Sequence, residues 1–242
     1  MQVLLFNLAA LFGAGAQGLT GFGSGTLTAT LLVMLFPFRD VIPVVAMVVL
    51  VPNIMMAWLI RRELDWRRGP IAAAGLALGI VVGAQLLAVL PAELLRRGLG
   101  IAIVFYVALM LWRTPTPHTV PARFGFDAAG LAGCALISGV IVGAVGVSPM
   151  PLLIYVSLRY PKKTARAVLT LAFVFGTAAQ NVAYFKLGLL TGELALMALL
   201  TVPGIVLGIL VGHRLHYRLD QKTFARALAL ILLLPGLRLA IG

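Results

Sequence analysis

The sequence predicts an all-α integral membrane protein made of two inverted repeats of about five helical segments. Each repeat is expected to start with a broken or re-entrant helical hairpin. The membrane is predicted by composition, because 62% of the 242 residues are hydrophobic and 11% are charged, at a mean hydropathy of +1.08. A soluble domain carries about 25% charged residues, so this chain lacks the charges to cover a water-facing surface. The repeat is predicted by a similarity between the two halves.

Long apolar runs bounded by charged residues or prolines divide the chain into ten segments. These runs exceed the length of strands and do not alternate with a period of two. Within lipid the backbone must satisfy its own hydrogen bonds, which favours helices. We therefore expect helical segments over residues 2–16, 26–36, 43–60, 69–90, 96–112, 128–143, 149–158, 165–185, 190–212 and 223–241.

The two halves share short matching stretches. GIVVG at 79–83 has a counterpart, GIVLG, at 204–208, an offset of 125 positions. At an offset of 124, Ser24 falls on Ser148. The order and lengths of the segments repeat as well. This predicts a first membrane repeat over residues 1–112, a cytoplasmic linker over 113–127 and a second membrane repeat over 128–242.

The first two segments of each half are too short to be two complete spans. A transmembrane helix needs about 20 residues, yet residues 2–36 and 128–158 each hold two apolar segments. Glycine-rich stretches at 18–25 and 139–151 interrupt these pairs. A helical hairpin that enters the membrane and turns back fits both pairs, and a single kinked helix is the alternative.

Basic loops favour the hairpins, because cytoplasmic loops of membrane proteins collect Lys and Arg. The strongest basic loops are 61–68 and 159–166, which are not equivalent positions of the repeat. If both face the cytoplasm, the halves are inverted and both termini are extracytoplasmic. This arrangement places fourteen of the 19 basic residues inside and leaves five outside: Arg39, Arg96, Arg97, Lys186 and Arg238.

The net charge of +12 would suggest nucleic-acid binding in a soluble protein. Here the basic residues lie in short runs between apolar segments, so we expect the lipid bilayer as the partner and no nucleic acid. Cys134 is the single cysteine, which excludes an internal disulfide. We expect no enzyme activity, catalytic residue, metal or cofactor, because every acidic residue lies in or beside a predicted loop: Asp40, Glu63, Asp65, Glu93, Asp127, Glu193 and Asp220.

The glycine-rich breaks are the best candidates for a binding site. A broken helix leaves backbone N–H groups without partners, and helix N-termini attract anions. Ser24 and Ser148 lie where they can cap the second and seventh helices and offer hydroxyls to an oxyanion. Buried amides are either contacts between helices or pathway lining. The expected substrate-binding residues are Gln17, Thr20, Gly21, Gly23, Ser24, Gly25, Asn53, Gly143, Gly146, Ser148, Pro149, Gln180 and Asn181.

The stretch QGLTGFGSG at 17–25 resembles the TauE/SafE family of sulfite exporters, also called TSUP. Members of that family often carry a second glycine-rich stretch at mid-chain, here GVIVGAVGVSP at 139–149, which has fewer glycines than the usual form. The resemblance covers nearly the whole chain. It implies transport of small sulfur anions such as sulfite, thiosulfate or organosulfonates across the bacterial cytoplasmic (inner) membrane.

We therefore expect a secondary transporter or facilitator for a small anion. The alternatives are a transporter of a different small solute and a membrane scaffold or assembly protein without transport activity. The sequence also leaves open the direction of transport, the coupling ion and the oligomeric state, of which a homo-oligomer is one alternative.

Overall fold

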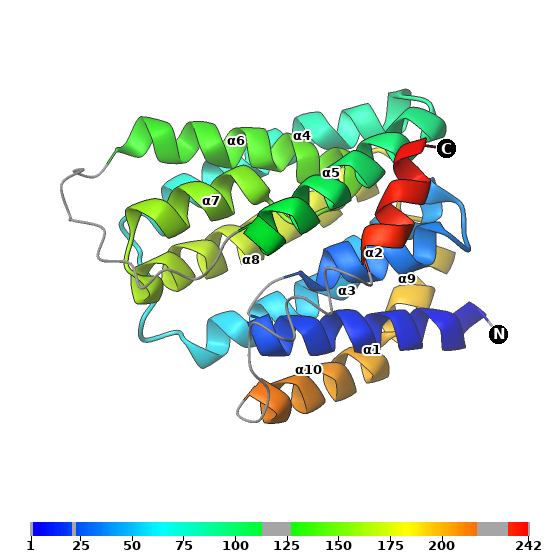
Figure 1. Cartoon of the computed structure of the whole chain (residues 1–242), viewed down its shortest axis with the longest axis horizontal. Helices are drawn as coiled ribbons and strands as arrows, with labels where there is room; N and C mark the ends of the chain where they lie inside the picture. Colours follow the sequence, from blue (N-terminus) through cyan, green and yellow to red (C-terminus); the bar gives the residue numbers. More distant parts are fainter. Residues whose placement is uncertain (1, 21–22, 113–126, 217–231, 242) are drawn as a thin grey trace.

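The computed structural model of the chain describes residues 2–20, 23–112, 127–216 and 232–241 (Figure 1). Over these residues it is helical, with turns and no strand. Five apolar stretches among them are long enough to cross a membrane, which makes the chain a multi-pass membrane protein. The helices are α1 (Gln2–Thr20), α2 (Ser24–Val33), α3 (Phe38–Leu59), α4 (Gly69–Val89), α5 (Ala92–Trp112), α6 (Ala128–Val145), α7 (Met150–Arg159), α8 (Lys162–Lys186), α9 (Gly192–Leu200), α10 (Val202–His216) and a last helix over Leu232–Ile241.

The ninth predicted segment differs from the prediction of one continuous helix. The helix is interrupted at Thr201, which separates α9 from α10. The N–H of Thr201 bonds to the Ala198 carbonyl, three residues back, and Pro203 follows without any N–H to donate. The predicted linker over 113–127 and the start of the tenth segment lie outside the described residues, except for Asp127, which caps α6.

The first two helices of each half pack antiparallel as hairpins, not as single kinked helices. In the first half the Thr28 hydroxyl donates to the Ala9 carbonyl at 3.4 Å, and Ser24 bonds to Gln17. In the second half the Leu152 N–H donates to the Ser138 hydroxyl at 2.8 Å. In both pairs, the short helix runs back along the long one, so that residues further along the short helix contact residues nearer the start of the long helix.

Helices of one half pack along helices of the other at two glycine seams. Gly79 of α4 lies so close to α6 that a Cβ there would overlap the carbonyl of Leu136. Gly208 of α10 approaches α1 in the same way, against the carbonyl of Leu11. Small residues let backbones approach closely where lipid supplies no hydrophobic force between helices. In both seams the two helices run parallel, and each seam joins the two halves of the chain.

The seam between α4 and α6 gives a prediction for stability. Gly139→Ala places a methyl group against the carbonyl of Leu76, and overpacking of this kind costs about 1–3 kcal/mol. Gly133→Ala on the same helix meets nothing within 4 Å and gains up to about 1 kcal/mol of helix propensity. We expect a lowered melting temperature for Gly139→Ala in detergent and an unchanged or raised one for Gly133→Ala. Equal melting temperatures would contradict the seam.

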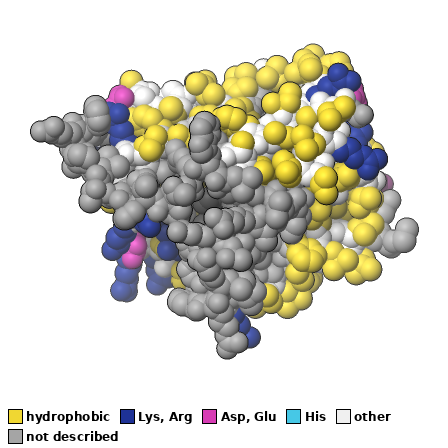
Figure 2. All heavy atoms as spheres, viewed as in Figure 1, with side chains coloured by type: hydrophobic (Ala, Val, Ile, Leu, Met, Phe, Trp, Pro, Cys, Tyr) yellow, Lys and Arg dark blue, Asp and Glu magenta, His cyan; other side chains and the backbone are white. Residues whose placement is uncertain are grey.

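The two predicted basic loops lie together at one end of the helix bundle. Lys163 Nζ is 3.7 Å from Glu63 Oε1, and the guanidinium of Arg68 lies 5.0 Å above the ring of Tyr160. These contacts join the α3–α4 loop to the start of α8, at the left of Figure 1. The start of α1 and the end of the helix over Leu232–Ile241 lie at the opposite end. In Figure 2, hydrophobic side chains predominate along the upper edge of the described part, between these ends.

The loop before α4 is organised by one carboxylate. Asp65 Oδ1 accepts hydrogen bonds from the N–H groups of Arg67 and Arg68, and its Oδ2 lies 2.8 Å from the Arg68 guanidinium. Partial burial alone would raise the pKa of Asp65, but the bonds from Arg68 and Arg67 together bring it below its ordinary value. The loop therefore holds its acid ionised beside its basic residues.

Candidate functional site

Two glycines with left-handed backbone mark the breaks in the two hairpins. Gly23, at φ 98°, directly precedes α2, and Gly146, at φ 72°, ends α6. Glycine adopts this conformation without the steric cost that a Cβ would bring. The breaks meet each other, because Thr26 Oγ1 lies 2.8 Å from Ser148 Oγ and accepts the Ser148 N–H at 2.9 Å. Residues more than 120 positions apart thus share one site.

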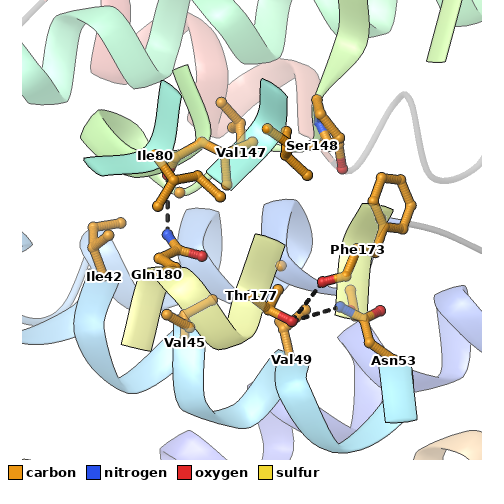
Figure 3. Close-up of a pocket in the computed structure, with 18 of the residues that line it drawn as sticks. Ile42, Val45, Val49, Asn53, Ile80, Val147, Ser148, Phe173, Thr177 and Gln180 are labelled. Carbon is orange, nitrogen blue, oxygen red and sulfur yellow. Dashed lines mark hydrogen bonds between the residues drawn. The ribbon is translucent and has the colours of Figure 1, made fainter. Parts of the chain in front are cut away.

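A pocket lies where the breaks meet helices α3, α4, α6 and α8 (Figure 3). It holds about 620 Å³ of space free of protein atoms, counting the part that opens outward. Among the described residues that line it, none is Asp, Glu, Lys, Arg or His. Its apolar walls are formed by Ile42, Val45, Ala46, Val49, Leu76, Ile80, Val142, Val147 and Phe173, and its polar side chains by Gln17, Ser24, Asn53, Ser148, Thr177 and Gln180.

A chain of buried hydrogen bonds crosses from one half to the other beside the pocket. The Ser24 hydroxyl donates to Gln17 Oε1, and Gln17 Nε2 donates to Asn53 Oδ1 at 3.1 Å. Asn53 Nδ2 then donates to Thr177 Oγ1 at 3.4 Å, and Thr177 donates to the Phe173 carbonyl at 2.6 Å. The four polar side chains are at most 9% exposed, so the amides are held in fixed orientations.

The N-termini of the two short helices differ in what they offer a ligand. In α2 the Leu27 N–H bonds to the Gly23 carbonyl, while the amides of residues 24–26 have no partner among the described residues. In α7 the Met150 N–H bonds to the Ser148 carbonyl, and the Leu152 N–H bonds to Ser138. Residues 149 and 151 are prolines without an N–H. Among the described residues, the start of α2 is therefore the end whose N–H donors have no partner.

The prediction that Ser24 and Ser148 cap the short helices is wrong. Ser24 is the first residue of α2 and makes no capping bond, because Gly23 occupies the cap position. Ser148 precedes the Pro149 cap of α7, and Ser138 of the neighbouring helix supplies the capping oxygen. Both serines nevertheless line the pocket.

Most of the predicted site residues converge on the pocket. Gly143 and Asn181 lie beside it: the Gly143 carbonyl accepts from Tyr184 at 2.7 Å, and Asn181 Nδ2 donates to the Ala46 carbonyl at 3.1 Å. Thr20 ends α1, its side chain outside the described part, and Gly21 is not described. The predicted residues that line the pocket are Gln17, Gly23, Ser24, Gly25, Asn53, Gly146, Ser148, Pro149 and Gln180.

The prediction missed two threonines and the apolar walls. Thr177 lies three residues before Gln180 on α8, so helical spacing places both on one face. Thr26 bonds to Ser148, and no signal in the sequence joins it to a segment in the other half. Within the described residues, no three His, Cys, Asp or Glu side chains gather as a metal site would require.

The chain has several apolar helices that are long enough to span a membrane, and a pocket between two helix breaks whose described lining has no charged side chain. These features define a multi-pass membrane protein with a small-molecule site. The sequence profile of the family described as sulfite exporter TauE/SafE matches residues 6–239. The chain therefore belongs to the TauE/SafE family of membrane transporters, which confirms the resemblance of its glycine-rich stretches.

A curated relative agrees with this family. The chain is 32% identical over 220 residues to the probable sulfite/organosulfonate exporter TauE of Cupriavidus necator, covering 87% of this chain and 83% of that protein. No solved structure matches the chain.

Proposed function

We propose that this chain moves a small sulfur oxyanion or organosulfonate across the bacterial inner membrane and holds it in the pocket between the breaks. The observation that carries the proposal is the free N-terminus of α2, whose first three amides have no described partner, beside a pocket with neutral polar side chains. A helix N-terminus acts as about half a positive charge and binds oxyanions through its N–H groups. The printed name of the Cupriavidus necator relative supports the same substrates.

The pocket is suited to release as well as to binding. Hydrogen bonds from neutral donors to a charged group are each worth about 1.5–3 kcal/mol net. A fixed Lys or Arg among the lining residues would hold an anion more tightly, and the described lining has neither. A transporter needs binding of this moderate strength, because the substrate must leave on the other side.

An inverted repeat is supported by the paths of equivalent helices. Asn53 bonds to Thr177 while Asn181 bonds to Ala46, so α3 and α8 run antiparallel across the pocket. The two ten-residue helices start at the pocket and run to opposite ends: α2 ends at Val33, and α7 ends at Arg159. At 1.5 Å per residue each spans about 15 Å, half of the hydrocarbon core, so the pocket would lie near its midplane.

The repeats would be residues 1–112 and 128–242, joined by the 113–127 linker. Each glycine seam joins helices from different halves. One group of helices can therefore rock against the other only if α1 moves together with α10, and α4 together with α6. Alternating access would then come from movement of one such group against the other around the pocket.

The end of the bundle with the basic loops would face the cytoplasm. Eight of the described basic residues lie in the two basic loops, four within 61–68 and four within 159–166. In a Cys134→Ala background, we expect cysteines introduced at Arg62 or Lys162 to resist an impermeant thiol reagent added to intact cells. Gly192→Cys at the other end, where nothing lies within 4 Å, should react. Labelling of Lys162→Cys from outside, with Gly192→Cys protected, would reverse this orientation.

Binding to the purified protein tests the proposed site. A ligand at 100 times its Kd adds about 2.7 kcal/mol to the free energy of unfolding, so sulfite or methanesulfonate should raise the melting temperature. Ser148→Ala removes a pocket hydroxyl and should weaken affinity for either anion about tenfold. Ser138→Ala removes the α7 cap instead, at about 1 kcal/mol of stability, with unchanged affinity. If Ser148→Ala lowers only the melting temperature, Ser148 does not bind the substrate.

A further inference from the structure

Gln180 presents one unused hydrogen-bond acceptor to the pocket. The residue is 3% exposed and lines the pocket. Its Nε2 donates both hydrogens, to the Val142 carbonyl at 3.1 Å and to the Tyr184 hydroxyl at 2.9 Å. Its Oε1 has no hydrogen-bond partner among the described residues. In Figure 3 the nitrogen of Gln180 turns toward its bonded carbonyl, and the oxygen points away from it.

The orientation of this amide is fixed by its neighbours. Tyr184 gives its single hydroxyl hydrogen to the Gly143 carbonyl at 2.7 Å, so it can only accept from Gln180. The Val142 carbonyl is also an acceptor. Both partners therefore require the NH₂ group of Gln180, and the opposite flip would place oxygen against oxygen. The carbonyl oxygen, which has no partner among the described residues, is left to accept a hydrogen bond from a ligand in the pocket.

The donors of the pocket lie on other elements. The free amides belong to the start of α2, and Asn53 and Ser148 face the pocket on the side away from Ile42 and Val45 (Figure 3). These groups carry no full charge, and one helix N-terminus supplies only about half a positive charge. Because the cost of burying an ion rises with the square of its charge, a dianion costs about four times as much as a monoanion. The pocket thus combines neutral donors for one negative charge with Gln180 Oε1, which can accept a hydrogen bond from the ligand.

We propose that the pocket binds singly charged oxyanions, and that it takes sulfur(IV) as hydrogensulfite, with the ligand's own O–H donated to Gln180 Oε1. This inference rests on the function proposed above and names the charge state of its substrate. The two unprotonated oxygens of the ligand would accept hydrogen bonds from the start of α2 and from the neutral donors beside it. Each transported hydrogensulfite ion then carries its own proton. No side chain of the protein has to gain or lose a proton.

The surroundings of Gln180 contain little that ionises near neutral pH. The pocket lining contributed by α2, α3, α4, α6 and α8 has no acidic, basic or histidine side chain among its described residues. The titratable side chain in contact with Gln180 is Tyr184, a phenol, and phenols ordinarily have a pKa of about 10. Hydrogensulfite itself loses its proton close to neutral pH, so a pH dependence of sulfite binding reports on the ligand.

The test compares sulfite with methanesulfonate, which is a monoanion at every pH used. We expect the apparent Kd for total sulfite, measured calorimetrically on the purified protein, to rise about fivefold or more from about pH 6 to about pH 8, following the hydrogensulfite fraction. The Kd for methanesulfonate should stay constant over this range. A sulfite Kd that is constant or falls with pH would overturn the inference while leaving the proposed function in place. Binding of neither anion would count against the proposed function instead.

A second variant tests the acceptor. Gln180→Met keeps the length of the side chain and removes its carbonyl oxygen, so sulfite binding at about pH 6 should weaken about tenfold more than methanesulfonate binding. The variant also loses the bonds to Val142 and Tyr184, but this loss affects the protein equally with either ligand. The ratio of the affinity loss for sulfite to that for methanesulfonate therefore reports on Gln180 Oε1 alone. An equal loss for both ligands contradicts the role of Gln180 Oε1. If this variant does not fold, the pH comparison on the unaltered chain still decides.

Discussion

Replacing Gly23 with leucine is expected to abolish transport. The backbone at this position has φ 98°, and a residue with a Cβ pays about 1–2 kcal/mol to adopt the left-handed region. Gly23 also lines the pocket directly before the three free amides of α2, so a leucine side chain there would fill the space beside the donors. Flux into proteoliposomes, measured with the melting temperature of the same preparation, would show loss of transport in a protein that still folds.

Gly188 supplies the matched control for backbone strain. It has φ 69° in the turn between α8 and α9, and a Cβ there would meet nothing within 4 Å. Gly188→Leu has a similar conformational cost far from the pocket, so we expect a lower melting temperature with transport retained. If both variants lose transport alike, the effect of Gly23→Leu comes from backbone strain and the pocket is not its cause.

Asn53→Leu is expected to have the second large effect. The side chain is 4% exposed and links Gln17 of the first hairpin to Thr177 of α8. Leucine has a similar size but leaves the Gln17 amide without its acceptor, which costs about 1–3 kcal/mol of stability. It also removes an amide from the pocket wall. We expect substrate affinity to fall about tenfold or more, measured by calorimetry with sulfite or methanesulfonate.

Asn181→Leu is the control, because Asn181 has the same chemistry without facing the pocket. It joins α8 to α3 through the carbonyls of Ala46 and Thr177. This variant should lose stability while keeping its Kd. Equal affinity losses in both variants would mean that Asn53 acts through the packing of α3 on α8 rather than as part of the site.

The helices and the approximate place of the site could be predicted from the sequence, because both depend on local signals. Apolar runs and their bounding charges mark the spans, and the glycines at 18–25 and 139–146 mark the breaks. That Ser24 and Ser148 do not cap their helices could not be predicted. It depended on whether Gly23 would take a left-handed cap, and on the two prolines that move the start of α7 to Met150.

The rest of the site depends on contacts between distant segments. Thr26 and Ser148 are 122 positions apart, and nothing in either local sequence indicates that they touch. Val45 and Val49 line the pocket, whereas Val81 and Val82 in a similar apolar helix are exposed, and nothing in the local sequence distinguishes them. The free acceptor of Gln180 follows only from its neighbours, because the hydroxyl of Tyr184 and the carbonyl of Val142 fix which way the amide turns.

The most direct test of the account is flux through the isolated chain. Purified protein in liposomes loaded with labelled methanesulfonate should release it in a saturable manner, faster than liposomes without protein. External sulfite should compete, and the Gly23→Leu variant should show only the background rate. Folded protein that gives no flux above protein-free liposomes, or that carries an uncharged solute without competition from sulfite, would contradict the assignment of the pocket to small sulfur anions.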